Sequence, residues 1–345
     1  MDAPSRRLCY HYRKSLHVQK IQIALRVWRG VLSKNGHCFW GEMTMLRRFI
    51  ALSAVAMLAA ACGRSPQVSG TKSITGPDYQ GHKYYFGWGV NGNGVGEMDN
   101  EVKYDVLHTS NIFSKAQGGS YISKTLIGED EVNARSIKQG WRTLTDEMQA
   151  NDMYLQYSSG HGYEGGLAAG VDYGNIIDAT LAMPAQEKVI FTMACYSGGL
   201  VDAFNDAKDR WSDYKNQNKT LFVMASSKAY EESSTGPGTD VDEPNGPDGS
   251  AGSAYGHAVW KALIGYADGA VDGQKDGKMT LDEVIKYVVQ DTEQEGGHTP
   301  VYTGTYDPKL VISLTPTYAE ALQIVGDTAP GRAELAKLVD DGIVK

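Results

Sequence analysis

Short apolar runs alternate with amphipathic stretches along most of this chain. The apolar runs have the length and composition of buried strands, and the stretches between them carry apolar residues at helical spacing. The expected strands are 83–88, 120–127, 152–157, 188–194 and 220–225, and the expected helices are 98–116, 129–149, 173–181, 199–209 and 252–266. Strands that alternate with helices need crossover connections, so the pattern predicts an α/β fold with a mostly parallel central sheet flanked by helices.

The beginning of the chain has the pattern of an export signal. Arg47 and Arg48 precede the uncharged apolar stretch 49–61, and Cys62 follows three alanines. This stretch of 13 residues is shorter than the roughly 20 that span a bilayer, so we favour a signal peptide over a transmembrane helix. The arrangement resembles the lipobox of bacterial lipoproteins, which implies cleavage before Cys62 and a lipid on its thiol. A plain secretory signal with an incidental cysteine is the alternative.

This interpretation divides the chain into five parts. Residues 1–44 are basic and precede the signal, and we expect them to be a non-native upstream extension; 45–61 are the lipoprotein signal peptide. Residues 62–80 are rich in Ser, Gly, Thr and Pro and suit a flexible tether. Residues 81–315 are the α/β domain, and 316–345 a helical C-terminal tail. The expected location is the bacterial cell envelope, on a lipid anchor that is directed to the outer membrane.

Charge excludes one class of partner. The whole chain has a net charge of −8, and without residues 1–61 it has 23 Lys and Arg against 39 Asp and Glu, which makes −16. Nucleic-acid binding requires a positive surface, so we expect no nucleic-acid partner. The expected partners are a peptide or protein substrate and, through Cys62, the membrane.

Two residues have the setting of a nucleophile and its base. His161 lies between Gly160 and Gly162 directly after one expected strand, and Cys195 follows another. The two are 34 residues apart, the length of one strand–helix–strand unit, so they should lie at the same edge of a parallel sheet. After cleavage before Cys62, Cys195 is the only ordinary thiol left in an oxidising compartment.

This placement predicts acyl-transfer chemistry. A neutral imidazole can accept the thiol proton and later protonate the leaving amine. The amides of Gly162 and Cys195 could face an oxyanion. The start of a helix near Gly198 should favour the thiolate. Taken singly, Cys195 is more simply a buried structural cysteine and His161 a turn histidine; the pair is more specific than either.

The residues around the pair resemble a known superfamily. Ser158-Ser159-Gly160-His161-Gly162 after one strand and Ala194-Cys195-Tyr196-Ser197-Gly198 after the next are similar to the caspase/legumain cysteine peptidases, over about residues 81–315. The resemblance implies a caspase-like three-layer sandwich. It also implies an endopeptidase in which His161 is the general base or acid, Cys195 the nucleophile that forms a thioester acyl-enzyme, and Gly162 part of the oxyanion site.

The substrate site departs from that pattern. Met193 stands where legumains, metacaspases and clostripain commonly have an acidic residue that helps to bind the residue before the cut. Glu231, Glu232, Asp240 and Asp242 are candidates to replace it, although a solvated acidic loop is the simpler interpretation of each. We expect the substrate to contact Met193, Ser226, Ser227 and Glu231.

A second motif concerns metal binding. Residues 272–283 fit an EF-hand-like loop, in which calcium ligands would be Asp272, Gln274, Asp276, Lys278, Thr280 and Glu283. Gln274 is a weaker ligand than the usual Asp or Asn. A capping box formed by Thr280 and Glu283 is the alternative, at about equal weight. The chemistry of Cys195 and His161 needs no cofactor. The loop resembles those of bacterial members of the same superfamily, and this resemblance implies that a bound Ca²⁺ would be structural.

Three other functions remain open. The same pair could serve a transpeptidase or transamidase. The chain could also be a binding lipoprotein that keeps the fold without activity, which the presence of Met193 favours. The third is a nucleotide-dependent oxidoreductase, which rests on a weak match to the dinucleotide fingerprint in Gly87-Trp88-Gly89-Val90-Asn91-Gly92. The match is weak because Gly94 and Gly96 precede the expected helix and no acidic residue follows at the expected spacing.

Overall fold

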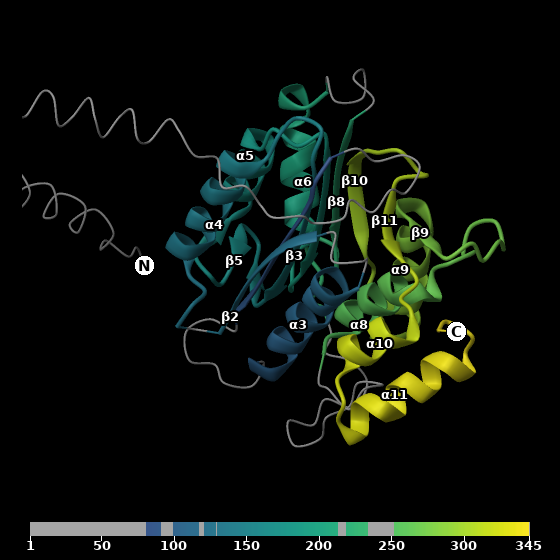
Figure 1. Ribbon diagram of the computed structural model, residues 1–345. Helices are drawn as coiled ribbons and strands as arrows, with labels where there is room; N and C mark the ends of the chain where they lie inside the picture. The colour runs from purple at the N-terminus through teal and green to yellow at the C-terminus, as the bar shows by residue number, and fades with distance from the viewer. Residues whose placement is uncertain are drawn as a thin grey trace, which may run out of the picture. The chain divides into compact units, whose positions relative to one another are not determined.

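Five parallel strands and one antiparallel edge strand form the central sheet (Figure 1). Its order is β10-β8-β7-β3-β1-β2. The strands are β1 (Lys83–Val90), β2 (Tyr121–Ile127), β3 (Met153–Gly160), β7 (Glu187–Met193), β8 (Thr220–Ala225) and β10 (Val301–Thr305). The five expected strands and the mostly parallel sheet are confirmed. Strand β10, which pairs antiparallel with β8, was not predicted, because its short polar sequence lacks an apolar run.

The structure, a computed structural model, describes residues 81–90, 99–116, 121–128, 130–212, 219–233 and 252–344. The upstream extension 1–44, the signal 45–61, and the whole tether 62–80 with Cys62 lie outside these residues. So do Asp240, Asp242 and the glycines that follow Val90. Within the described ranges, no helix is both long enough and apolar enough to cross a membrane.

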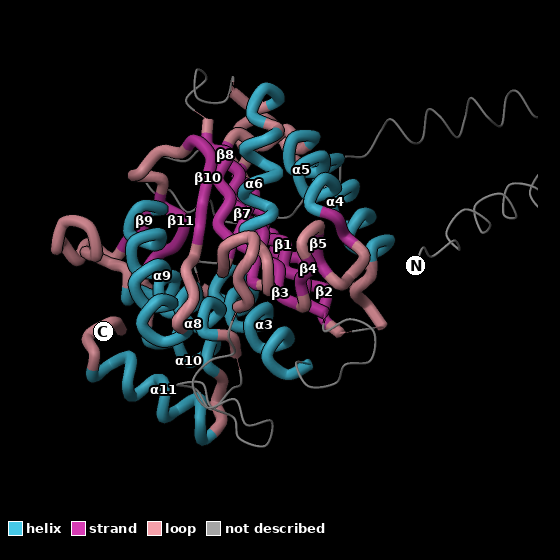
Figure 2. Tube along the Cα trace, turned by 180° about the vertical axis from the view of Figure 1, so that it is seen from behind, coloured by secondary structure: helices cyan, strands magenta, loops and turns pink. Residues whose placement is uncertain are grey.

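Helices cover both faces of the sheet (Figures 1 and 2). On one face lie α3 (Asp99–Lys115), α8 (Ala254–Lys261) and α9 (Leu281–Gly296). On the other lie α4 (Ala134–Glu147), α5 (Tyr173–Ala182) and α6 (Gly198–Asp206). Because both faces are covered, all residues of β3 and β7 are buried, which explains why these strands carry apolar side chains on both faces instead of on one. The predicted three-layer α/β sandwich is confirmed.

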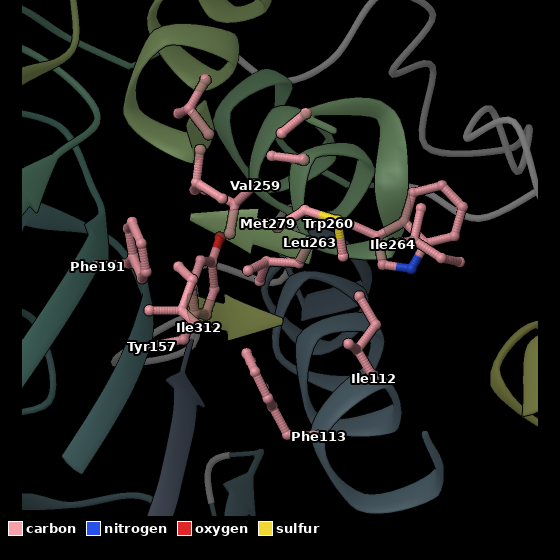
Figure 3. Packing of buried hydrophobic residues seen from close by; sticks show 14 of the residues in the cluster. Ile112, Phe113, Tyr157, Phe191, Val259, Trp260, Leu263, Ile264, Met279 and Ile312 are labelled. Atoms are coloured by element: carbon pink, nitrogen blue, oxygen red, sulfur yellow. The ribbon is translucent and has the colours of Figure 1, made fainter. Parts of the chain in front are cut away.

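The two cores follow the alternation of side chains along the strands. In β1, Tyr84 and Phe86 belong to the core under α4 and α5, whereas Tyr85 belongs to the core under α3 and α8. Figure 3 shows the second core, where Tyr157 of β3 and Phe191 of β7 lie beside side chains of α3, α8 and the π-helical turn η3 (Ala262–Tyr266).

Smaller elements complete the domain. A three-stranded sheet of β4 (Gly162–Tyr163), β5 (Gly166–Leu167) and β6 (Val171–Asp172) follows β3 directly. Strands β9 (Lys278–Thr280) and β11 (Val311–Leu314) pair antiparallel, and η2 (Lys208–Arg210) follows α6. The expected helical tail consists of α10 (Tyr318–Val325) and α11 (Ala329–Asp340), whose buried residues, such as Ile324 and Leu338, join the core under α3.

One buried polar contact fixes the middle of β3. The Gln156 side-chain oxygen accepts hydrogen bonds from Trp141 Nε1 of α4 at 2.9 Å and from the Tyr154 hydroxyl at 2.7 Å. All three side chains are buried. The bond to Trp141 ties α4 to the sheet at a defined height.

We expect Gln156→Ala to destabilise the domain strongly, because it leaves two buried donors without their acceptor, at about 1–3 kcal/mol for each. Urea denaturation measures the change, with the exposed Gln139→Ala as the control. Equal midpoints for the two variants would contradict this assignment.

Candidate active site

The register of β3 against β7 brings the two candidate residues together. Ser158 pairs with Thr192 and Ser159 with Met193, a constant offset of 34 residues. The same offset separates His161 from Cys195. Both residues therefore leave the sheet at its carboxyl edge, on adjacent parallel strands, as the sequence predicted.

Gly162 shows how closely the two loops approach. A Cβ atom at this position would lie 1.9 Å from the carbonyl oxygen of Cys195 and 2.9 Å from Cβ of Ala194. Only glycine allows the backbone after His161 to pass over the backbone of Cys195 at this distance. The neighbouring carbonyl of His161 is held by the amide of Ala168 at 2.9 Å. A role of the Gly162 amide in binding an oxyanion stays a prediction.

The Cys195 thiol is half-buried. Its sulfur donates a long hydrogen bond, 3.8 Å, to the carbonyl oxygen of Ser233. Burial raises the pKa of the thiol, and the Glu232 carboxylate raises it further. The direction of this shift opposes the thiolate that the start of α6, at Gly198, was expected to favour. The sulfur needs a base to become a nucleophile.

One ring nitrogen of His161 makes no hydrogen bond. Its Nε2 atom is buried and has no hydrogen-bond partner among the described residues. An unpaired buried polar atom costs stability, so its retention requires an explanation. A general base that receives its proton from a bound reactant would be such an explanation, since catalytic hydrogen bonds often form fully only in the complex.

The backbone directly after the cysteine is strained. Tyr196 has φ 58°, the only positive value at a non-glycine residue in the described ranges. Such a conformation costs about 1–3 kcal/mol and persists only where surrounding contacts enforce it. The Tyr196 amide donates to the Glu231 carbonyl at 2.8 Å, and its carbonyl accepts from the Tyr173 hydroxyl at 3.0 Å. Its own hydroxyl donates to Glu232 at 2.9 Å.

Serine hydroxyls hold the residue before the cysteine. The carbonyl of Ala194 accepts hydrogen bonds from Ser226 at 3.1 Å, Ser227 at 3.2 Å and Ser233 at 2.9 Å. The Ser226 hydroxyl also accepts from the Ala194 amide at 3.1 Å. The segment after β8 therefore fixes the position of the cysteine loop.

The four residues predicted to contact substrate lie below or beside the cysteine loop and support it. Ser226 and Ser227 are fully buried below the loop, and Met193 is only 1% exposed in the core. One Glu231 carboxylate oxygen accepts from the amides of Lys228 and Thr299, each at 3.1 Å. Contact with a substrate stays a prediction for these four. Glu232, which is exposed, is the acidic side chain whose charge acts on the Cys195 thiol.

The small residues after the cysteine serve packing. A Cβ atom at Gly198 would lie 2.4 Å from the amide nitrogen of Ala229, and one at Gly199 would lie 2.7 Å from the ring of Tyr173. These glycines let α6 start against the 227–229 segment. Their effect is this close contact between the start of α6 and its neighbours.

A second histidine braces the same segment. His298 Nδ1 lies 2.6 Å from the carbonyl oxygen of Ser226, and the side chain is 3% exposed. Burial lowers the pKa of this imidazole, so it is neutral near pH 7 and its Nδ1–H donates to the carbonyl. The next residue, Thr299, donates its amide to the Glu231 carboxylate, so this segment also fixes the 228–231 loop.

Several candidate calcium ligands of the EF-hand-like loop accept hydrogen bonds from within the protein. Glu283 and Thr280 form the capping box of α9, and the second Glu283 oxygen accepts from the Gly269 amide at 2.9 Å. Asp272 accepts from the amide of Gln274 and Asp276 from that of Lys278, at 2.8 and 2.9 Å. In the described residues, no group of three or more His, Cys, Asp or Glu side chains is placed to hold a metal ion. The capping alternative is confirmed, and calcium binding stays a prediction.

Comparisons with known proteins add a likeness in fold. No protein-family model matches the chain, and no curated protein matches it either. Among solved structures, protein GSU0716 from Geobacter sulfurreducens superposes with a TM-score of 0.44 at 12% identity, over 68% of this chain and 99% of that one. Caspase-1 from Spodoptera frugiperda gives 0.47 at 12% identity, over 73% and 99%. Such distant likenesses carry no argument about activity.

We expect Gly162→Ala to leave the domain folded but to slow alkylation of Cys195 by iodoacetamide, because the new methyl must push the His161 loop away from the cysteine backbone. The rate is measured by mass spectrometry of the Cys195 peptide. Gly174→Ala on α5 is the control, since a Cβ there meets nothing within 4 Å. Equal rates for both variants would show that the close approach does not matter to the thiol.

We expect Glu283→Ala to cost about 0.5–2 kcal/mol in the presence of a chelator, because it removes a helix cap. Glu320→Ala, in the equivalent capping box of α10, is the matched control. Thermal melting is then repeated with millimolar Ca²⁺. A rise in Tm for the wild type and Glu320→Ala but not for Glu283→Ala would establish the calcium site; equal responses of all three would exclude it.

Proposed function

We propose that this chain is a cysteine endopeptidase that cleaves peptide bonds through Cys195 and His161. One observation carries the proposal: the β3–β7 register, with the contact of Gly162 on the Cys195 carbonyl, puts thiol and imidazole at one sheet edge. The partly exposed thiol and the unpaired Nε2 of His161 support it. The resemblance of both motifs to caspase/legumain peptidases supports it further.

The proposed reaction has two halves. His161 Nε2 takes the thiol proton, and the Cys195 sulfur attacks the peptide carbonyl carbon to give a tetrahedral oxyanion, which the amides of Gly162 and Cys195 would bind. The C–N bond then breaks as His161 returns the proton to the leaving amine, which leaves a thioester. In the second half His161 deprotonates water and the hydroxide attacks the thioester carbon. The C–S bond then breaks, the carboxylic acid product leaves, and the protonated His161 returns the proton to the sulfur.

The environment of the thiol shapes this mechanism. Since the pKa of Cys195 is raised, the resting site holds a neutral thiol, and proton transfer accompanies attack. The base is therefore essential. An acyl transferase would use the same first half and pass the acyl group to an amine instead of water.

The proposed location depends on Cys62. The motif of Arg47-Arg48, an apolar stretch and a small-residue site before Cys62 supports a lipid-anchored protein of the bacterial cell envelope. Loss of fatty-acid labelling in Cys62→Ser, in cells that process the wild type, tests the anchor separately from the chemistry.

We expect Cys195→Ala and His161→Ala each to abolish hydrolysis of a peptide library, by at least about 10³-fold for the cysteine, because the nucleophile or its base is removed. Thermal melting of both variants controls for folding. Transfer of the acyl group to an added amine without hydrolysis would establish the transferase alternative. Unchanged hydrolysis in Cys195→Ala would exclude both, and binding of peptides without turnover by the wild type would leave a binding protein.

A further inference from the structure

A buried carboxylate lies behind the candidate dyad. Asp105 of α3 is 2% exposed, and its two oxygens accept three hydrogen bonds. Oδ2 accepts from the hydroxyls of Ser159 and Ser253, each at 2.8 Å, and Oδ1 accepts from the amide of Ser253 at 2.9 Å. A buried carboxylate is costly unless such donors surround it, so the network is a built feature of the fold.

One donor belongs to the strand that leads to the site. Ser159 is the penultimate residue of β3 and lies two positions before His161 in the sequence. Its hydroxyl also lies 3.6 Å from the sulfur of Met193, two residues before Cys195. Asp105 therefore fixes the end of β3 that leads to His161, next to the last residue of β7.

The other donor fixes the start of α8. Ser253 is the N-cap of this helix and accepts from the Gly256 amide at 2.8 Å. A Cβ atom at Gly256 would lie 2.0 Å from Asp105 Oδ1, so the helix backbone rests directly on the carboxylate. One side chain thus joins α3, β3 and α8 behind the site.

We propose that Asp105 is a positioning residue for the candidate dyad, which acts through Ser159 to hold His161 at the level of Cys195. The inference depends on the proposed use of this pair. Asp105 does not touch the reacting atoms; it fixes the strand end on which the base is mounted.

The charge of Asp105 makes the role testable. Burial raises the pKa of its carboxyl to about 6, against the opposing effect of the Ser253 and Ser159 hydrogen bonds. Above this pH the ionised group accepts from all three donors; below it, the protonated group is itself a donor and the network must rearrange. The titratable groups that face it are Tyr157 of β3, His108 of α3 and His257 of α8.

Ionisation of Asp105 is proposed to order the site, but it lowers the stability of the folded domain. Because the pKa is higher in the folded than in the unfolded chain, this group favours folding most at acid pH, and that contribution is lost as pH rises from about 4 to about 6. Ionised Asp105 therefore orders the site at a cost to global stability.

The test compares Asp105→Asn with Asp152→Asn. Asp152 is a matched control: it is 1% exposed, precedes β3 at its other end, and accepts from the amides of His82 and Gln149 at 2.8 and 2.7 Å. For each protein we measure peptide hydrolysis and iodoacetamide alkylation of Cys195 from pH 5 to 8. Ser159→Ala, which keeps the carboxylate and removes only the link to β3, is a second variant.

We expect Asp105→Asn to lower kcat and the alkylation rate by about 10- to 100-fold at pH 7.5 with little change in KM, as a small displacement of a catalytic group does. Ser159→Ala should change both in the same direction. The gap between wild type and Asp105→Asn should close as pH falls through about 6, since the protonated wild type then resembles the variant. Asp152→Asn should lower Tm without a pH-dependent loss of either rate.

Several results would overturn the proposal. It fails if Asp105→Asn slows alkylation no more than Asp152→Asn, or if the gap does not depend on pH. It also fails if His108→Gln abolishes the pH dependence, because His108 would then be the titrating group, or if wild-type Cys195 resists alkylation. The expected alkylation pattern in a wild type that hydrolyses no peptide would keep Asp105 as a positioning residue and exclude the endopeptidase.

Discussion

The candidate site depends on one constraint, the parallel in-register pairing of β3 with β7. Parallel strands begin at one edge of a sheet and end at the other, so residues that follow two neighbouring strands at equal offset emerge together. The offset of 34 residues holds from Met153 with Glu187 to Ser159 with Met193. A slip of one residue would turn the buried side chains of a whole strand to the wrong face, so the cores on both sides of the sheet protect this register.

Beyond the strand ends, the geometry of the site is made by backbone contacts. The left-handed Tyr196, the three hydroxyls on the Ala194 carbonyl and the close approach of Gly162 together determine where the sulfur points. This construction gives a neutral thiol in a partly desolvated setting, which a neighbouring base has to activate. Strain and buried polar groups are tolerated here because the well-packed sheet below supplies the stability.

Much of the fold could be predicted because its strands are strong local signals. Five strands and the layer order follow from apolar runs that alternate with helical patterns, and the offset of His161 from Cys195 predicted a shared edge. The edge strand β10 could not be predicted in this way, since VYTGT has little apolar character and becomes a strand only by pairing with β8. The loop 272–283 was ambiguous because capping and metal binding require the same Thr280 and Glu283.

The sequence by itself determined the layers of the domain, the sheet edge that carries the candidate pair and the identity of the sulfur and the imidazole. Only the tertiary structure decided the direction in which the pKa of the Cys195 thiol shifts, because burial and Glu232 act through space. It alone brought Asp105 to Ser159 and Ser253, residues 54 and 148 positions away along the chain. Hydrogen bonds at such separations leave no local periodicity, so no pattern of neighbouring residues could have indicated them.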